Sequence, residues 1–160
     1  MIIGIDPGLT GGVAVLNRDM CSLYVLKVTD KFLDIEHLKE VLLKYQGAKV
    51  YLEKVHSMPK QGVASSFKFG KVLGAIMGLL SGLGFDYSMI TPQAWQKAVH
   101  TVPKDEVPDP KQRSLIAVRL LFPNIDLRAS NRCKIPHKGL VDALLIAEAG
   151  RLMERGRMTL

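Results

Sequence analysis

Strand-like segments open this chain one after another, and only later do they alternate with helical segments. Strands that follow one another directly form a meander, whereas strands separated by helices build layered α/β sheets. We therefore expect an α/β fold with a mixed five-stranded sheet and helices on both faces. The expected strands are residues 1–6, 12–16, 20–28, 49–55 and 85–91, and the expected helices are residues 34–45, 67–83, 92–99, 111–122 and 139–154.

Size and charge narrow the class of protein. With 160 residues the chain suits one domain, spanning residues 1–160. Hydrophobic residues make up 48% of it, enough for a buried core and against long-range disorder. Lys and Arg outnumber Asp and Glu by 22 to 15, so the net charge of +7 points to an anionic partner. The alternative is a generically basic protein without such a partner.

Two features indicate a cytoplasmic protein. Cys21 and Cys133 are too few for a disulfide framework or a four-ligand zinc site. The longest uncharged stretch, residues 72–85, is shorter than the roughly 18 to 20 residues that span a bilayer. We expect no signal peptide and no membrane association.

Three carboxylates stand in apolar surroundings: Asp6 ends a strand, Glu53 lies within another, and Asp142 lies near the start of the last helix. A buried carboxylate is normally paired or bound to a metal. If the three converge they repel one another, and a divalent cation resolves that repulsion. Each also has a simpler interpretation: an Asx turn at Asp6, an ion pair with a lysine at Glu53, and a favourable helix dipole at Asp142.

Oxygen ligands favour Mg²⁺, with Mn²⁺ as a substitute, over zinc. Two such ions about 4 Å apart would activate water and stabilise the leaving oxygen in phosphodiester cleavage. The three carboxylates therefore indicate a metal-dependent nuclease.

The motifs around these carboxylates resemble those of the RuvC family of Holliday-junction resolvases, most closely its compact phage and organelle-type members. They are IGIDPGLTGG at residues 3–12, YLEK at 51–54 and VDALLIA at 141–147, with SFKFGK at 66–71 similar to the stretch after the glutamate motif. The resemblance implies an RNase H-like fold, a homodimer and paired Mg²⁺-dependent nicking of four-way DNA junctions to 5′-phosphate products. It makes Asp6, Glu53 and Asp142 catalytic metal ligands.

The fourth active-site position departs from the family, which has an acid or His three or four residues before the last carboxylate. Gly139 and Lys138 occupy those positions here. His137 lies five residues before Asp142, about 140° away on an ideal helix, and reaches the site only if the helix starts after it. His137 is our candidate to bind metal or orient water, with Lys138 as the second candidate. Alternatively, His137 is a loop residue near a DNA phosphate.

Basic residues interleaved with aromatic ones predict a DNA-binding surface. Phe67 is the candidate to stack on an unpaired base, whereas Phe69 fits the core better. For any single lysine, plain solvation is the alternative. The predicted DNA-binding residues are Lys60, Phe67, Lys68, Lys71, Lys111, Arg113, Lys134 and Lys138.

Glycines recur every fourth residue in the helix expected at residues 67–83. They form a stripe that lets another backbone approach closely. The partner is either the sheet of the same chain or a second copy. A two-fold dimer would present two acidic sites to two symmetric strands of a junction.

We thus expect a structure-selective endodeoxyribonuclease that resolves four-way junctions in a bacterial or phage-infected cytoplasm, without a nucleotide cofactor. Three alternatives stay open. Sugar kinases of the actin-like superfamily share the opening motif but need two lobes. Another RNase H-like nuclease would cut other branched DNA or RNA. A non-catalytic protein would only bind junctions.

Overall fold

A computed structural model describes residues 1–18, 20–54 and 62–156 and contains the expected mixed sheet. Its strand order is β3-β2-β1-β6-β7. β1 pairs antiparallel with β2 and parallel with β6, and β6 pairs parallel with β7. The strands are β1 (Ile2–Asp6), β2 (Gly12–Leu16), β3 (Cys21–Val25), β6 (Lys49–Glu53) and β7 (Tyr87–Ile90).

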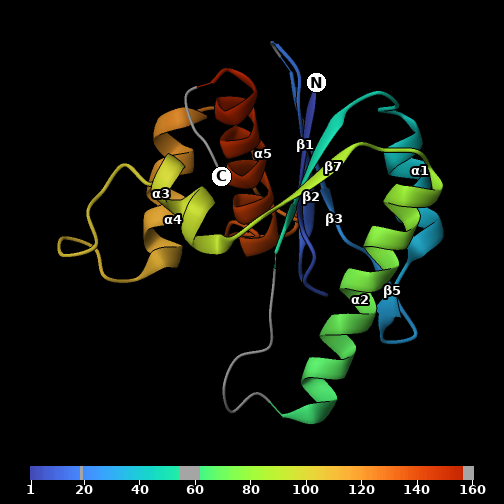
Figure 1. Ribbon diagram of the computed structural model, residues 1–160. Coiled ribbons are helices and arrows are strands. Elements are labelled where there is room, and N and C mark those ends of the chain that lie inside the picture. Colours follow the sequence, from blue (N-terminus) through green and yellow to red (C-terminus); the bar gives the residue numbers. More distant parts are fainter. Residues whose placement is uncertain (19, 55–61, 157–160) are drawn as a thin grey trace.

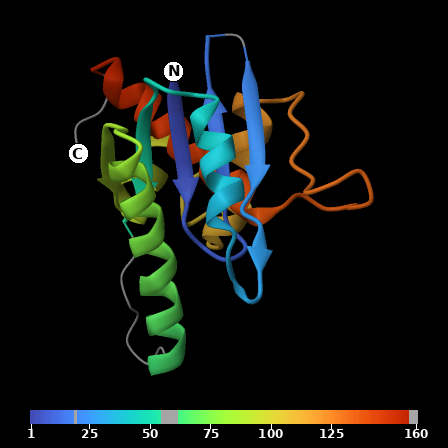
Figure 2. The ribbon, with the colours of Figure 1, turned by 90° about the vertical axis from the view of Figure 1, so that its right-hand side faces the viewer.

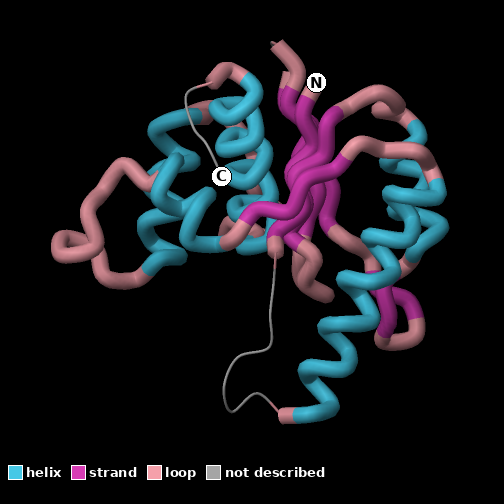
Figure 3. The backbone as a smooth tube through the Cα atoms, in the orientation of Figure 1, coloured by secondary structure: helices cyan, strands magenta, loops and turns pink. Residues whose placement is uncertain are grey.

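Helices cover both faces of the sheet, as predicted (Figures 1 and 3). On one face lie α3 (Pro92–Val99), α4 (Pro110–Leu121) and α5 (Lys138–Glu154). On the other lie α1 (Ile35–Leu43) and α2 (Val63–Gly82). Because side chains alternate along a strand, Ile2 joins the core under α5 while Ile3 joins the core under α1 and α2.

A small hairpin replaces the end of one expected strand. Instead of one strand over residues 20–28, β3 is followed by β4 (Val28–Thr29) and β5 (Phe32–Leu33). The two turn residues, Asp30 and Lys31, have φ angles of 51° and 64°. Two consecutive positive φ angles are typical of the tight hairpin turn that usually carries Asn-Gly or Asp-Gly. Because Asp-Lys stands there instead, the sequence did not indicate a hairpin at this position.

α2 begins at Val63, earlier than expected, and projects past the sheet (Figure 2). Val72, Ile76 and Leu80 anchor it to the core, while its first turns are largely exposed. By length and composition alone, α2 is also the one described helix that could cross a membrane, a test that core helices pass as well. It carries Lys68 and Lys71.

Close backbone packing seats α5 on the sheet. A Cβ atom at Gly4 of β1 would collide with the Ala143 carbonyl and the Ala147 nitrogen. A Cβ atom at Gly139 would collide with the backbone of Thr10 and Gly11. Glycine at these positions therefore lets the first turns of α5 lie against the end of β1, and this brings Asp142 toward Asp6.

Candidate active site

Asp6 is the last residue of β1 and lies at the centre of the site. The Gly8 backbone N–H donates to Asp6 Oδ1 at 3.2 Å, so the turn foreseen as the simpler interpretation is present. Burial nevertheless raises the pKa of Asp6, against this hydrogen bond and the nearby charge of Lys111. A carboxylate used only for a surface turn would keep its solvation, so the turn does not account for this environment.

Glu53 ends β6, which pairs in parallel with β1, so the two carboxylates leave the same edge of the sheet. The Trp95 indole N–H donates to Glu53 Oε1 at 2.8 Å. Burial, and then the charges of Asp6 and Asp142, raise the pKa of Glu53 to about 7, although the Trp95 hydrogen bond lowers it. Within the described ranges Glu53 forms no ion pair with a lysine, so that alternative is not supported.

Asp142 comes from the second turn of α5. Burial raises its pKa to about 7, and the charge of Asp6 adds to the effect. Lys111 and a hydrogen bond from Ser114 act in the opposite direction. Asp6, Glu53 and Asp142 thus come together from three elements: the charge of Asp6 acts on Glu53 and Asp142, and the charge of Asp142 acts on Glu53.

The donor chemistry of this centre fits a hard divalent cation. Carboxylate oxygens are the ligands that Mg²⁺ and Mn²⁺ prefer. A cation would offset both the burial of these carboxylates and the repulsion that adds to the raised pKa values of Glu53 and Asp142. However, the described residues contain no group of three His, Cys, Asp or Glu side chains already close enough to hold a metal ion. The three carboxylates fit the cation by type and charge.

His137 is the N-cap residue of α5, immediately before Lys138. This meets the condition for His137 to approach the site, because the helix starts after it. Its Nδ1 atom is buried and has no hydrogen-bond partner among the described residues, and burial lowers its pKa. A neutral imidazole with a free ring nitrogen is suited to bind a metal or a water molecule. Its role stays a prediction.

A cavity of about 350 Å³ opens beside Asp142. Leu115, Ile135, Pro136 and Val141 form its apolar wall, and Lys111 and Lys138 lie at its charged part. Lys111 is exposed, yet its charge acts on both Asp6 and Asp142. Two predicted DNA-binding lysines therefore border the acidic centre.

The remaining predicted DNA-binding residues are distributed over two other regions. Phe67, Lys68 and Lys71 lie on the projecting part of α2, where Phe67 is 68% exposed and the Lys71 ammonium lies 5.8 Å from its ring centre. Lys134 is exposed in the loop before α5. Lys60 lies outside the described residues.

Arg113 is a correction to the sequence analysis. It is only 8% exposed, and its guanidinium donates to His100 Nδ1 and to the carbonyls of Val107 and Pro108. These internal hydrogen bonds leave little of the group available to a phosphate. The amphipathic pattern of α4 does not distinguish a solvated arginine from one that closes a loop.

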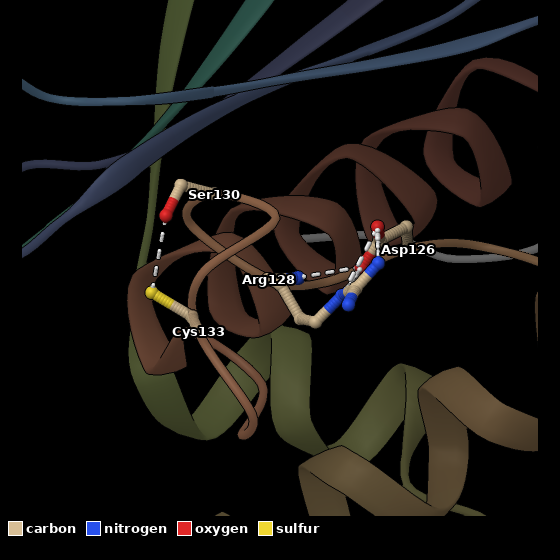
Figure 4. A network of polar contacts seen from close by, with 4 residues as sticks. All are labelled: Asp126, Arg128, Ser130 and Cys133. Atoms are coloured by element: carbon tan, nitrogen blue, oxygen red, sulfur yellow. Dashed lines mark hydrogen bonds and ion pairs between the residues drawn. The ribbon is translucent and has the colours of Figure 1, made fainter.

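The basic loop before α5 is also partly neutralised. Figure 4 shows Arg128 turned onto Asp126 and Ser130 beside Cys133. Arg128 Nη2 lies 2.8 Å from Asp126 Oδ2, and Arg128 Nε donates to Oδ1 at 2.9 Å. This pairing lowers the pKa of Asp126 to about 2. The loop therefore offers less free positive charge than its lysines and arginines suggest.

Three polar residues around the carboxylates belong to none of the motifs recognised in the sequence. Trp95 is buried like an ordinary core residue, but it also donates to Glu53. His100 and Ser114 were given no role, yet their side chains lie 3.1 Å apart and Ser114 reaches Asp142. The available signal was weak: a polar atom on an otherwise apolar helix face.

Solved structures of known proteins share the fold of this chain. The chain matches no family model and no curated protein. Among solved structures it is similar to T. thermophilus RuvC in complex with a Holliday junction substrate, with a TM-score of 0.70 and 19% identity, covering 99% of this chain and 97% of that one. The chain has the fold of RuvC.

A second structure of Thermus thermophilus RuvC agrees, with a TM-score of 0.60, 20% identity and coverage of 99% and 98%. The α/β RNase H-like fold implied by the three acidic motifs is therefore confirmed. At 19–20% identity the similarity establishes the fold alone. The activity has to be inferred from the residues of the candidate active site.

Proposed function

We propose that this protein is a metal-dependent endonuclease that resolves four-way DNA junctions. One observation carries the proposal: Asp6, Glu53 and Asp142 meet in a partly buried, mutually repelling acidic centre. The match to T. thermophilus RuvC in complex with a Holliday junction substrate covers 97% of that RuvC chain, and this supports a junction as the DNA.

In this proposal Asp6, Glu53 and Asp142 hold Mg²⁺, or Mn²⁺ in its place. Bound there, the cation would lower the pKa of water and stabilise the leaving oxygen of the phosphodiester. His137 orients the attacking water or adds a ligand through its free Nδ1 atom. Lys111 and Lys138 hold the phosphate backbone beside the carboxylates.

The DNA path also includes α2. Phe67 stands exposed on the projecting part of the helix, with Lys68 and Lys71 near it. An exposed aromatic ring among lysines is suited to stack on a base that a junction leaves unpaired. Lys60 extends the same basic segment in sequence.

The functional unit in this proposal is a homodimer joined along α2. Within the part of the chain that the structure describes, a Cβ atom added at Gly70, Gly74, Gly78 or Gly82 would meet nothing within 4 Å. The stripe therefore does not serve packing against the sheet of its own chain, which corrects one of the two interpretations. A second copy would use this open, narrow face and present two acidic centres to the junction.

Cleavage of a synthetic four-way junction with and without Mg²⁺ tests the proposal. Linear duplex, flap and RNA–DNA hybrid substrates are run beside it. We expect symmetric nicks in the junction, lost in Asp6→Asn and kept in the matched surface variant Asp86→Asn, whose partner is Lys49. Tight junction binding without cleavage would contradict the nuclease, and better cleavage of the flap or hybrid would contradict the substrate.

A further inference from the structure

A chain of polar side chains leads from the loop before α4 to Asp142. Arg113 Nε donates to His100 Nδ1 at 3.2 Å. His100 Nε2 lies 3.1 Å from Ser114 Oγ, and the Ser114 side chain lies near enough to the Asp142 carboxylate to lower its pKa. This series of polar side chains runs from the end of α3 through α4 to α5, three helices that pack on one another.

Only one direction of hydrogen bonding fits this order. A guanidinium is always charged and only donates, so His100 Nδ1 must accept. The neutral imidazole then carries its proton on Nε2 and donates it to Ser114 Oγ. Ser114 therefore has its own hydrogen free for the carboxylate of Asp142. Burial and the charge of Arg113 lower the pKa of His100, in agreement with a neutral ring.

The series of polar side chains is held in place at Arg113, the end away from Asp142. Arg113 Nη1 donates to the carbonyls of Val107 and Pro108, at 2.6 and 2.9 Å. The rings of Trp95 and His100 are nearly perpendicular, with 5.8 Å between ring centres, and Ser114 is almost fully buried. Side chains held in this way have few other rotamers, so they can define the orientation of the group at the near end.

We propose that Arg113, His100 and Ser114 are positioning residues that orient the carboxylate of Asp142 for a divalent cation. The inference rests on the proposed function of Asp142 as a metal ligand. Hydrogen bonds to a ligating carboxylate fix its rotation and commonly change metal affinity by about 10- to 100-fold when removed. Trp95 contacts both the His100 ring and Glu53, so α3 supports two of the three carboxylates.

The competing explanation is that these groups only satisfy one another inside the protein. Buried polar groups are normally hydrogen bonded for stability alone. A merely structural network would change the melting temperature but would leave the metal affinity of the folded protein unchanged. The test must therefore measure metal binding apart from both stability and DNA cleavage.

The experiment measures Mn²⁺ binding to the full chain without DNA, by electron paramagnetic resonance, together with the melting temperature. Asp142→Asn identifies the part of the binding that needs this carboxylate. We expect Ser114→Ala and His100→Phe to weaken that binding about tenfold. His100→Gln should retain more affinity than His100→Phe, because its amide can accept from Arg113 and donate to Ser114. The matched control is His37→Phe, at a half-buried histidine on α1, and should bind as the original protein.

The order of hydrogen bonds is also tested in the unsubstituted protein. Nitrogen-15 NMR of the imidazole should show His100 protonated on Nε2 only, and a proton on Nδ1 would overturn the proposal. This measurement keeps the inference testable if Ser114→Ala or His100→Phe does not fold.

The two proposals fail in different ways. Unchanged Mn²⁺ affinity in Ser114→Ala and His100→Phe, in a protein that cuts junctions, overturns the positioning role alone. Weakened affinity in a protein that cuts no junction supports the positioning role and overturns the nuclease. Absence of Mn²⁺ binding in the unsubstituted protein overturns both.

Discussion

The carboxyl groups of the acidic centre ionise less readily in the folded chain than in the unfolded one. Burial raises the pKa values of Glu53 and Asp142 to about 7, from 4.5 and 3.8. A raised carboxyl pKa stabilises the fold fully below the unfolded value, and the stabilisation is lost as the pH rises through the folded value. The metal-free protein should therefore lose stability between about pH 4 and pH 7.

This prediction is checked by melting temperature across that range in a chelating buffer. Each kcal/mol lost lowers the melting temperature by roughly 2–4 °C in a chain of this size. Glu53→Gln should flatten the decline, and Mg²⁺ should restore stability at pH 7 because it binds the ionised form. A melting temperature independent of pH, with and without Mg²⁺, would be incompatible with a strained acidic centre.

Trp95→Phe removes the hydrogen bond to Glu53 while keeping an aromatic ring at this buried position. The indole N–H lowers the pKa of Glu53, so its loss should raise that pKa further and make protons stronger competitors of the cation. A hydrogen bond to a charged group contributes about 1.5–3 kcal/mol. The Mg²⁺ concentration needed for half-maximal cleavage should rise about tenfold or more at pH 7. An unchanged requirement for Mg²⁺ would assign Trp95 to packing alone.

Single residues were predictable where a local rule applied. Asp6 and Glu53 stand out because a carboxylate interrupts an apolar strand, and the strand order puts both at one edge. Arg113 was misjudged and Ser114 overlooked, because their partners come from other elements, which periodicity along α4 does not reveal. Supporting hydrogen bonds depend on tertiary contacts, so the sequence indicated the carboxylates but not what holds them.

At the scale of elements, helices and strands with a regular apolar pattern were predicted within a few residues. The departures have local causes. The β4–β5 hairpin turns on Asp30 and Lys31, residues that are unusual at positive φ. The start of α2 lies in a polar segment that carries no helical pattern, since those turns project from the core and need no apolar face.

Close approach of α5 to β1 predicts opposite effects for two groups of glycines. Gly4→Ala and Gly139→Ala should each destabilise the fold by about 1–3 kcal/mol or more, because the added methyl collides with backbone. Gly82→Ala should instead stabilise the monomer by up to about 1 kcal/mol, since in the single chain the methyl meets open space in a helix. Urea unfolding of the three variants compares them directly. Equal effects would contradict the packing described for α5.

The α2 stripe predicts a link between association and paired nicking. Gly74→Glu together with Gly78→Glu should leave the folded chain intact, since both sites are open, but should place like charges between two copies. Sedimentation should show monomers, and the two nicks in a junction should become independent. A double variant that stays dimeric would move the interface away from this face. Exposed Lys97, changed to Glu on α3, is the control for added negative charge.

At the scale of the whole molecule, the net charge of +7 predicts salt-dependent DNA binding. Junction affinity of the inactive Asp6→Asn variant should fall steeply with salt, because each bound phosphate releases a counterion. Adding Lys68→Ala and Lys71→Ala should reduce the slope of log affinity against log salt by about 1 for each phosphate that a lysine no longer binds. Lys39→Ala, in an ion pair on α1, should leave the slope unchanged. Equal slopes in all variants would remove α2 from the DNA path.

The acidic centre needs side chains from β1, β6 and α5. Because α5 is synthesised last of the three, the centre can form only late in the synthesis of the chain. Asp6 and Glu53 leave the ribosome early, yet neither has its third neighbour until α5 has emerged and docked on β1. Synthesis at about 5–20 residues per second separates these events by several seconds. A nascent polypeptide therefore has no complete acidic centre before α5 has emerged and packed on β1.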